Sequence, residues 1–122
     1  MDTDAAWNAI TSLYADPAVA RDLLRRQDEE GLDVTLHLFA LWAGTQGVPL
    51  DAGDLADSDA EVAAWRAQVV QPLRALRRAI KAMGKNTPAS HDIEAVRTLV
   101  QAAELAAERV QVGMLCTWLQ TR

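Results

Sequence analysis

Cysteine is almost missing from this sequence, and its scarcity limits the chemistry that the chain can perform. The 122 residues include one cysteine, Cys116, and two histidines. A single thiol cannot close an internal disulfide, and it does not supply the set of thiolates that a zinc finger needs. The lone cysteine is typical of a reducing compartment, so we expect a cytoplasmic protein.

Long apolar runs are also missing. The longest such run, residues 34–44, contains His37 and is far shorter than the roughly 20 residues that cross a bilayer. The first residues, Met1-Asp2-Thr3-Asp4, lack the basic stretch and apolar segment of a secretory signal. We therefore expect no membrane association.

No segment alternates apolar and polar residues with the two-residue period of a half-buried strand. Apolar residues instead recur every three or four positions, between capping residues and glycines that end helices. This pattern predicts an all-α fold: a compact bundle of about five helices, the last two long, with no sheet. The length suits a single helical domain over residues 1–122.

Local signals place the ends of these helices. The first is expected to run from about residue 4 to Ala15, the second from Pro17 to near Gly31, and the third over residues 34–46, capped by Asp33. The third is apolar on nearly all sides, which is typical of a helix at the centre of a bundle. Ser58 and Glu61 resemble a capping box that opens a long fourth helix, within which a proline predicts a kink.

Apolar residues of the last helix, expected to begin after Ser90, recur at nearly heptad spacing. They are Ile93, Val96, Val100, Ala103, Ala107, Val110, Met114 and Trp118. Such spacing predicts packing along the fourth helix or pairing with another subunit.

The charge is negative overall but unevenly distributed. A net charge of −5 opposes general binding to nucleic acid or to anionic membranes. Residues 62–86 nevertheless carry six basic residues and no acid, with Arg74, Arg77, Arg78 and Lys81 at helical spacing. Planar guanidinium groups in this arrangement can hold phosphates or acidic partners. The alternatives are a solvated face, or ion pairs with the acidic residues of the same chain.

Polar residues also gather around the turn before the third helix, at Gln27, Asp28, Asp33 and Thr35. Buried polar groups need hydrogen-bonding partners, so these residues either line a small pocket or fix the register between helices. Asp33 and His37, four positions apart, are a candidate pair for a metal or for proton transfer. Their structural alternative is a helix cap and a partly buried histidine.

The order of several residue groups resembles that of a proteobacterial family of small helical proteins, a domain of unknown function. The groups span residues 7–83: Trp7, Leu13-Tyr14, Pro17, Gln27-Asp28, Gly31, Asp33-Val34, Phe39, Trp42, Trp65-Arg66, Val69-Val70 and Pro72-Leu73-Arg74-Ala75-Leu76-Arg77-Arg78. The resemblance implies a small, all-helical, cytoplasmic protein and no particular activity. Thr35 and His37 depart from the family pattern, which has asparagine and an apolar residue there.

These observations favour a non-enzymatic protein-interaction or regulatory module, because the sequence offers no pair of nucleophile and base. The expected partner is another protein or a second copy, which makes a homodimer one form of the hypothesis. The alternative is a bundle that binds a small molecule or anion. Its residues, shared with the partner hypothesis, are Gln27, Asp28, Asp33, Arg74, Arg77 and Arg78. A metal-dependent enzyme is a weaker third hypothesis, and we assign no catalytic residue, metal or cofactor.

Overall fold

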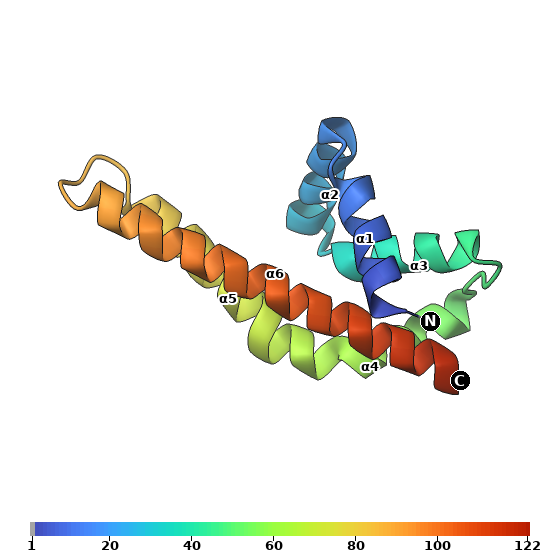
Figure 1. Cartoon of the computed structure of the whole chain (residues 1–122). Coiled ribbons are helices and arrows are strands. Elements are labelled where there is room, and N and C mark those ends of the chain that lie inside the picture. The colour runs from blue at the N-terminus through green and yellow to red at the C-terminus, as the bar shows by residue number, and fades with distance from the viewer. Residues whose placement is uncertain (1) are drawn as a thin grey trace. The chain divides into compact units, whose positions relative to one another are not determined.

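The computed structural model describes residues 2–122, and within this range the chain contains helices and no strand (Figure 1). The helices are α1 (Thr3–Tyr14), α2 (Pro17–Glu30), α3 (Val34–Thr45), α4 (Ala52–Trp65), the π-helical segment η1 (Arg66–Val70), α5 (Gln71–Met83) and α6 (Ser90–Thr121). Because α4, η1 and α5 follow one another without a break, they form one long helical run. The prediction of an all-α fold with about five helices, the last two long, is confirmed.

The chain forms two compact units. One unit comprises the residues up to Val62 together with Gln111–Arg122, and the other comprises Ala63–Val110. Helices α4 and α6 each contribute residues to both units. That the whole chain acts as a single domain stays a prediction.

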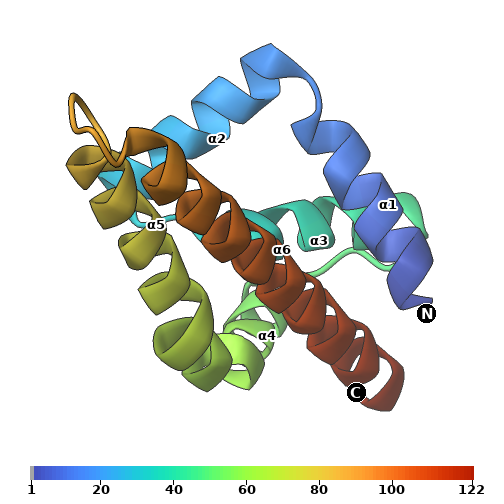
Figure 2. The same cartoon turned by 60° about the vertical axis from the view of Figure 1, so that its left-hand side comes forward.

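Helix α3 supplies the centre of the first unit. More than half of its residues are buried, and Phe39 and Ala43 are fully enclosed. Helix α1 contacts both α2 and α3 (Figures 1 and 2). The buried apolar cluster consists of Ala6, Ile10, Leu23, Val34, Leu36, Leu38, Phe39, Trp42, Ala43, Val62, Val112, Leu115, Cys116 and Leu119. A helix that is apolar on nearly every side is thus surrounded by others, as predicted.

The ends of α2 and the start of α3 follow their local signals. Asp16 accepts a hydrogen bond of 2.9 Å from the Ala18 N–H, and Pro17 occupies the first position of α2. Gly31 closes α2 with φ of 68°, a left-handed conformation that glycine adopts without steric cost. Asp33 caps α3, because its Oδ1 accepts a 3.1 Å hydrogen bond from the Leu36 N–H.

The predicted start of the fourth helix was wrong. Helix α4 begins at Ala52, and its capping box is formed by Asp51 and Asp54. The Asp54 N–H donates to Asp51 Oδ1 at 2.8 Å, while the Asp51 N–H donates to Asp54 Oδ2 at 3.1 Å. Ser58 lies inside the helix, fully buried, with its hydroxyl donating to the Leu55 carbonyl at 2.9 Å.

The proline of the long helical run is accommodated by a π turn. A proline lacks an N–H, and its ring clashes with the carbonyl four residues earlier in a regular α-helix. Here the N–H of Gln71, directly before Pro72, donates to the Arg66 carbonyl five residues back. The wider turn changes the helical phase, and Val70 becomes the buried valine while Val69 is only half-buried.

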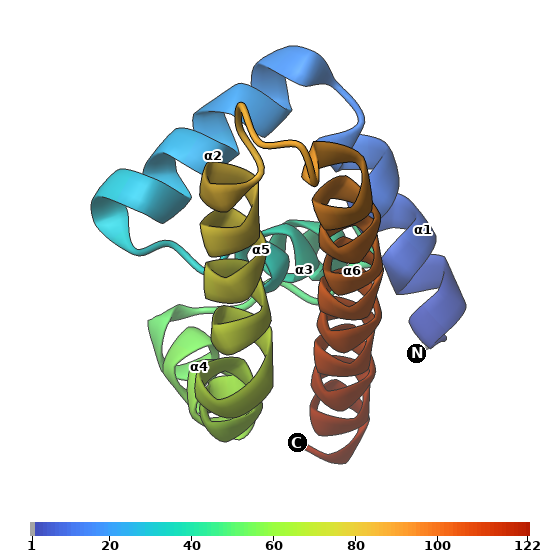
Figure 3. The same cartoon turned by 90° about the vertical axis from the view of Figure 1, so that its left-hand side faces the viewer.

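In the second unit, α5 and the part of α6 up to Val110 form an antiparallel helical hairpin (Figures 1 and 3). Near one end, the Trp65 indole Nε1 donates to the Ala107 carbonyl at 2.8 Å. At the other end, a Cβ on Gly84 would lie 3.1 Å from Ile93 Cγ2, so the glycine permits a close approach. The half-buried Trp65 therefore both packs in the hairpin and satisfies its N–H, as tryptophans with an enclosed indole usually do.

No helix within residues 2–122 has the combination of length and apolar content that is required to traverse a bilayer.

Candidate functional site

Two of the predicted arginines meet a buried carboxylate inside the hairpin. Glu104 on α6 is 5% exposed. Its Oε2 lies 3.1 Å from Arg74 Nε, and its Oε1 lies 2.5 Å from Arg77 Nε. A second carboxylate, Glu108, lies 3.3 Å from Arg74 Nη2. We name these four residues the ion cluster.

The ion cluster results from the spacing of charges on two antiparallel helices. Arg74 and Arg77 are three positions apart on α5, and Glu104 and Glu108 are four positions apart on α6, so each pair shares one helix face. Both arginine side chains are largely buried, at 18% and 21% exposure. Buried charges are tolerated when they are paired and hydrogen-bonded, so the cluster compensates its own charges inside the hairpin.

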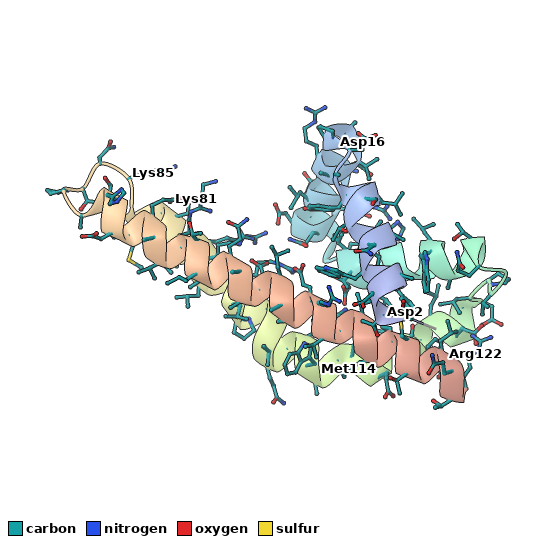
Figure 4. All side chains as sticks on the ribbon, viewed as in Figure 1. Asp2, Asp16, Lys81, Lys85, Met114 and Arg122 are labelled. Carbon is teal, nitrogen blue, oxygen red and sulfur yellow. The ribbon has the colours of Figure 1, made fainter. Side chains whose placement is uncertain are left out.

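The other basic residues of α5 are placed differently. Arg78 and Lys81 are exposed. Figure 4 shows Lys81 and Lys85 toward the loop between α5 and α6. The predicted stripe of arginines is therefore divided, with Arg74 and Arg77 facing α6 and Arg78 at the surface.

The polar turn of the first unit is anchored by Asp33. Its Oδ2 accepts a 2.8 Å hydrogen bond from the Gln111 amide, and its Oδ1 caps α3. Gln111 is 1% exposed, so this bond satisfies an amide that has no access to water. Gln27 is half-buried and Asp28 is exposed. The geometry at Asp33 matches the register-fixing alternative, in which one side chain aligns α3 with α6.

Gln111 was missed at the sequence level, although its position carried a signal. Arg97, Glu104 and Gln111 recur every seven residues on α6, and each is largely or fully buried. The sequence predicted Val96, Ala103 and Val110 for the packed side, but these three residues are exposed. Polar residues thus replace aliphatic ones along one line of the packed surface of α6.

Burial alters the acidity of both His37 and Cys116. Burial, followed by the positive charge of Arg26, lowers the pKa of the half-buried His37 imidazole. Burial raises the pKa of the Cys116 thiol, which is 2% exposed and packs in the apolar cluster. In residues 2–122, no three or more histidine, cysteine or acidic side chains are grouped so that they could hold a metal ion.

The hairpin also carries an exposed apolar surface. Its larger members are between 46% and 70% exposed. We name as the apolar hairpin face the residues Leu76 and Met83 of α5 and Val96, Leu99, Ala103, Ala106 and Val110 of α6. The α6 residues alternate steps of three and four, which places them on one stripe.

Both helices present these residues on the same side. Leu76 follows the half-buried Leu73 by three positions, and Val110 follows the buried Ala107 by three positions. Three residues turn an α-helix by about 300°, so a side chain three positions after an inward-facing one points about 60° away from the partner helix. The direction of this turn is the same on both helices when each is followed along its own chain. Because the two helices face each other and run in opposite directions, both turns lead to the same side of the hairpin. Leu105, one position after Glu104, is rotated in the opposite sense and is 48% exposed on the other side.

Comparison with known proteins gives a family and no further relative. No curated protein and no solved structure matches the chain. The family model described as "Protein of unknown function (DUF2390)" matches residues 5–115. The match extends beyond the groups over residues 7–83 into α6, so it includes both the ion cluster and the apolar hairpin face. This chain belongs to the DUF2390 family.

Proposed function

We propose that this protein is a non-enzymatic interaction module that contacts a protein partner through the apolar hairpin face. The observation that carries the proposal is the exposure of Leu99, Met83 and Val96, at 70%, 67% and 50%, on one side of the hairpin. Grouped exposed hydrophobic side chains are typical of a surface that another molecule covers. The α6 stripe continues without a charged residue for five consecutive positions, from Val96 to Val110, and Asp92 lies one turn before it.

The reactive residues of the chain give further support. Cys116 is enclosed in the apolar cluster with a raised pKa, which disfavours the nucleophilic thiolate. The His37 imidazole is half-buried, and its surroundings lower its pKa. An interaction role requires neither group.

The ion cluster weighs against the anion-binding alternative. An external anion would have to displace Glu104 from Arg74 and Arg77, whose charges are already compensated at 3.1 Å and 2.5 Å. We propose that these arginines stabilise the hairpin that presents the apolar face. Gln27, Asp28 and Arg78 keep their place as predicted contact residues of the alternative.

The setting that we propose is the cytoplasm of a proteobacterium. A buried cysteine with no second cysteine in the chain suits a reducing compartment. The bacterial origin rests on the resemblance of the residue groups over 7–83.

The proposal is tested by comparing two leucines of α6. Immobilised parent chain, Leu99→Glu and Leu105→Glu are exposed to bacterial lysate that contains an untagged copy of the chain. Because Leu99 lies on the apolar hairpin face and Leu105 on the opposite side, we expect a protein retained by the parent and by Leu105→Glu but lost with Leu99→Glu. Identical sets of retained proteins on all three baits would refute the proposed function.

A further inference from the structure

We infer that the occupant of the apolar hairpin face is a second copy of this chain, bound about a twofold axis. The inference rests on the proposed function and names its partner. The resulting interface contains four helices, two hairpins in contact through the same face. Such an interface is isologous, so the face must be complementary to itself.

The order of side-chain sizes along α6 provides this complementarity. If a twofold axis passes near Ala103 and the two α6 helices run antiparallel, Val96 of one copy lies opposite Val110 of the other, each seven positions from the axis. Leu99, four positions before the axis, then lies within one position of the point opposite Ala106, three positions after it. Leu99 of each copy thus meets the small Ala106 of the other, which allows the helices to approach and interdigitate.

The hairpin needs such a partner because its own core is thin. Helix α5 contains no fully buried residue. Within Ala63–Val110, the described buried residues are Val70, Glu104 and Ala107, fewer than the exposed large hydrophobic residues of the same range. Helices gain most of their stability from packing an apolar face, so a second hairpin on the apolar side completes what α5 and α6 alone leave open.

The available area suits a reversible dimer. The α6 stripe spans residues 96–110, about 21 Å along the helix axis at about 1.5 Å per residue. Two helices side by side are about 20 Å wide, which gives a footprint of about 400 Å² per copy and about 800 Å² for the pair. Obligate dimers bury about 2,000 Å² or more, whereas weak and transient contacts lie below about 1,200 Å².

The charge of the hairpin also has a consequence for association. Residues 63–110 contain eight lysines and arginines against four acids, a net charge of +4. Two hairpins in contact therefore repel one another at long range, and salt screens this repulsion. Added salt should strengthen the dimer, whereas it weakens the binding of an acidic protein partner.

Sedimentation velocity on the purified full chain tests the inference, over about 1 to 500 μM, where complexes of micromolar affinity populate both states. We expect a monomer–dimer equilibrium that shifts toward dimer between about 0.05 and 0.5 M NaCl. Leu99→Glu should weaken association about 100-fold, because each carboxylate buried in an apolar contact costs at least about tenfold and symmetry doubles the substitution. Leu105→Glu is the matched control and should dimerise like the parent.

A second variant, Leu76→Glu on α5, guards against a folding defect in Leu99→Glu, and far-ultraviolet circular dichroism verifies the helicity of each.

A chain that stays monomeric at every concentration would overturn the inference. A dimer that survives both substitutions, or that salt weakens, would overturn it as well. If the purified chain is monomeric but Leu99→Glu still loses another protein from lysate, the second copy is excluded and the proposed function stands. If nothing is lost in either experiment, both fail.

Discussion

Glu104 offers the sharpest prediction, because one carboxylate faces two arginines inside the hairpin. The substitution Glu104→Gln keeps the size of the side chain and removes its charge. It leaves Arg74 and Arg77 near one another with a neutral amide, whose NH₂ group is itself a donor directed at donors. We therefore expect a large loss of stability from a change of a single functional group.

The magnitude follows from burial. Removing one partner of a buried ion pair costs about 3–5 kcal/mol, because the remaining charge is left uncompensated. The arginines retain 18% and 21% exposure, so water screens part of this cost, and we expect the free energy of unfolding to fall by about 2–4 kcal/mol. This is a large share of the roughly 5–15 kcal/mol that stabilises a small protein.

Urea denaturation followed by circular dichroism measures the effect, at one fixed protein concentration because association adds to apparent stability. With a slope of about 2 kcal/mol per molar urea, the midpoint should fall by about 1–2 M. Glu94→Gln is the control, since the Glu94 carboxylate is 57% exposed and water can replace it as the partner of Arg97, so its midpoint should stay nearly unchanged.

A quadruple substitution tests the cause. Replacing all four residues of the ion cluster, Arg74, Arg77, Glu104 and Glu108, by methionine removes the charges as well as the pairs, so this variant should be more stable than Glu104→Gln. If Glu104→Gln unfolds at the midpoint of the parent, the carboxylate does not hold the two arginines, and the account of the ion cluster is refuted.

Three further predictions concern the first unit. Asp33→Ala should lower the free energy of unfolding by about 2–4 kcal/mol, since it removes a helix cap and leaves the buried Gln111 amide without its acceptor, whereas Asp33→Asn, which retains an acceptor, should cost less in the same urea assay. Because the folded state lowers the pKa of His37, the free energy of unfolding should keep its full value above the ordinary pKa near 6.5 and decrease as the pH drops below it. His37→Gln should reduce this dependence of the unfolding free energy on pH, and an unchanged slope would contradict the assignment to His37. Cys116 should react with a thiol reagent only after unfolding, and the raised pKa of its thiol means that stability is lost as the pH rises above the ordinary thiol pKa; rapid labelling of the native chain would contradict its burial.

Helix ends set by nearby residues were predictable from the sequence. The caps at Asp16 and Asp33 and the left-handed Gly31 depend on contacts within a few residues, so their signals are contained in short segments. The start of α4 could not be predicted in this way, because Ser58 and Glu61 fit the same local sequence pattern as a true capping box. Complete burial of Ser58 is a tertiary property, and it requires the helix to have begun before that residue.

The packed side of α6 was predicted only in part. Spacing correctly placed Ile93, Val100 and Ala107 on the inward side, but Val96 and Val110 were also expected there. Burial of Glu104 and Gln111 is favourable only with Arg74, Arg77 and Asp33 as partners, and these partners lie far away in the sequence. Apolar periodicity alone contains no information on such pairs, which is why the apolar hairpin face emerged from the structure.

The seven-residue recurrence of Arg97, Glu104 and Gln111 has a consequence for how α6 can align. Aliphatic side chains alone would permit several alignments of two helices along their axes, because one aliphatic side chain can take the place of another in the contact. If α6 slid by one heptad in one direction, Arg97 would replace Glu104 and three cations would crowd together; sliding the other way would offer the cations only an uncharged amide. The order of charged and neutral residues on α6 therefore permits only one alignment of α6 along α5.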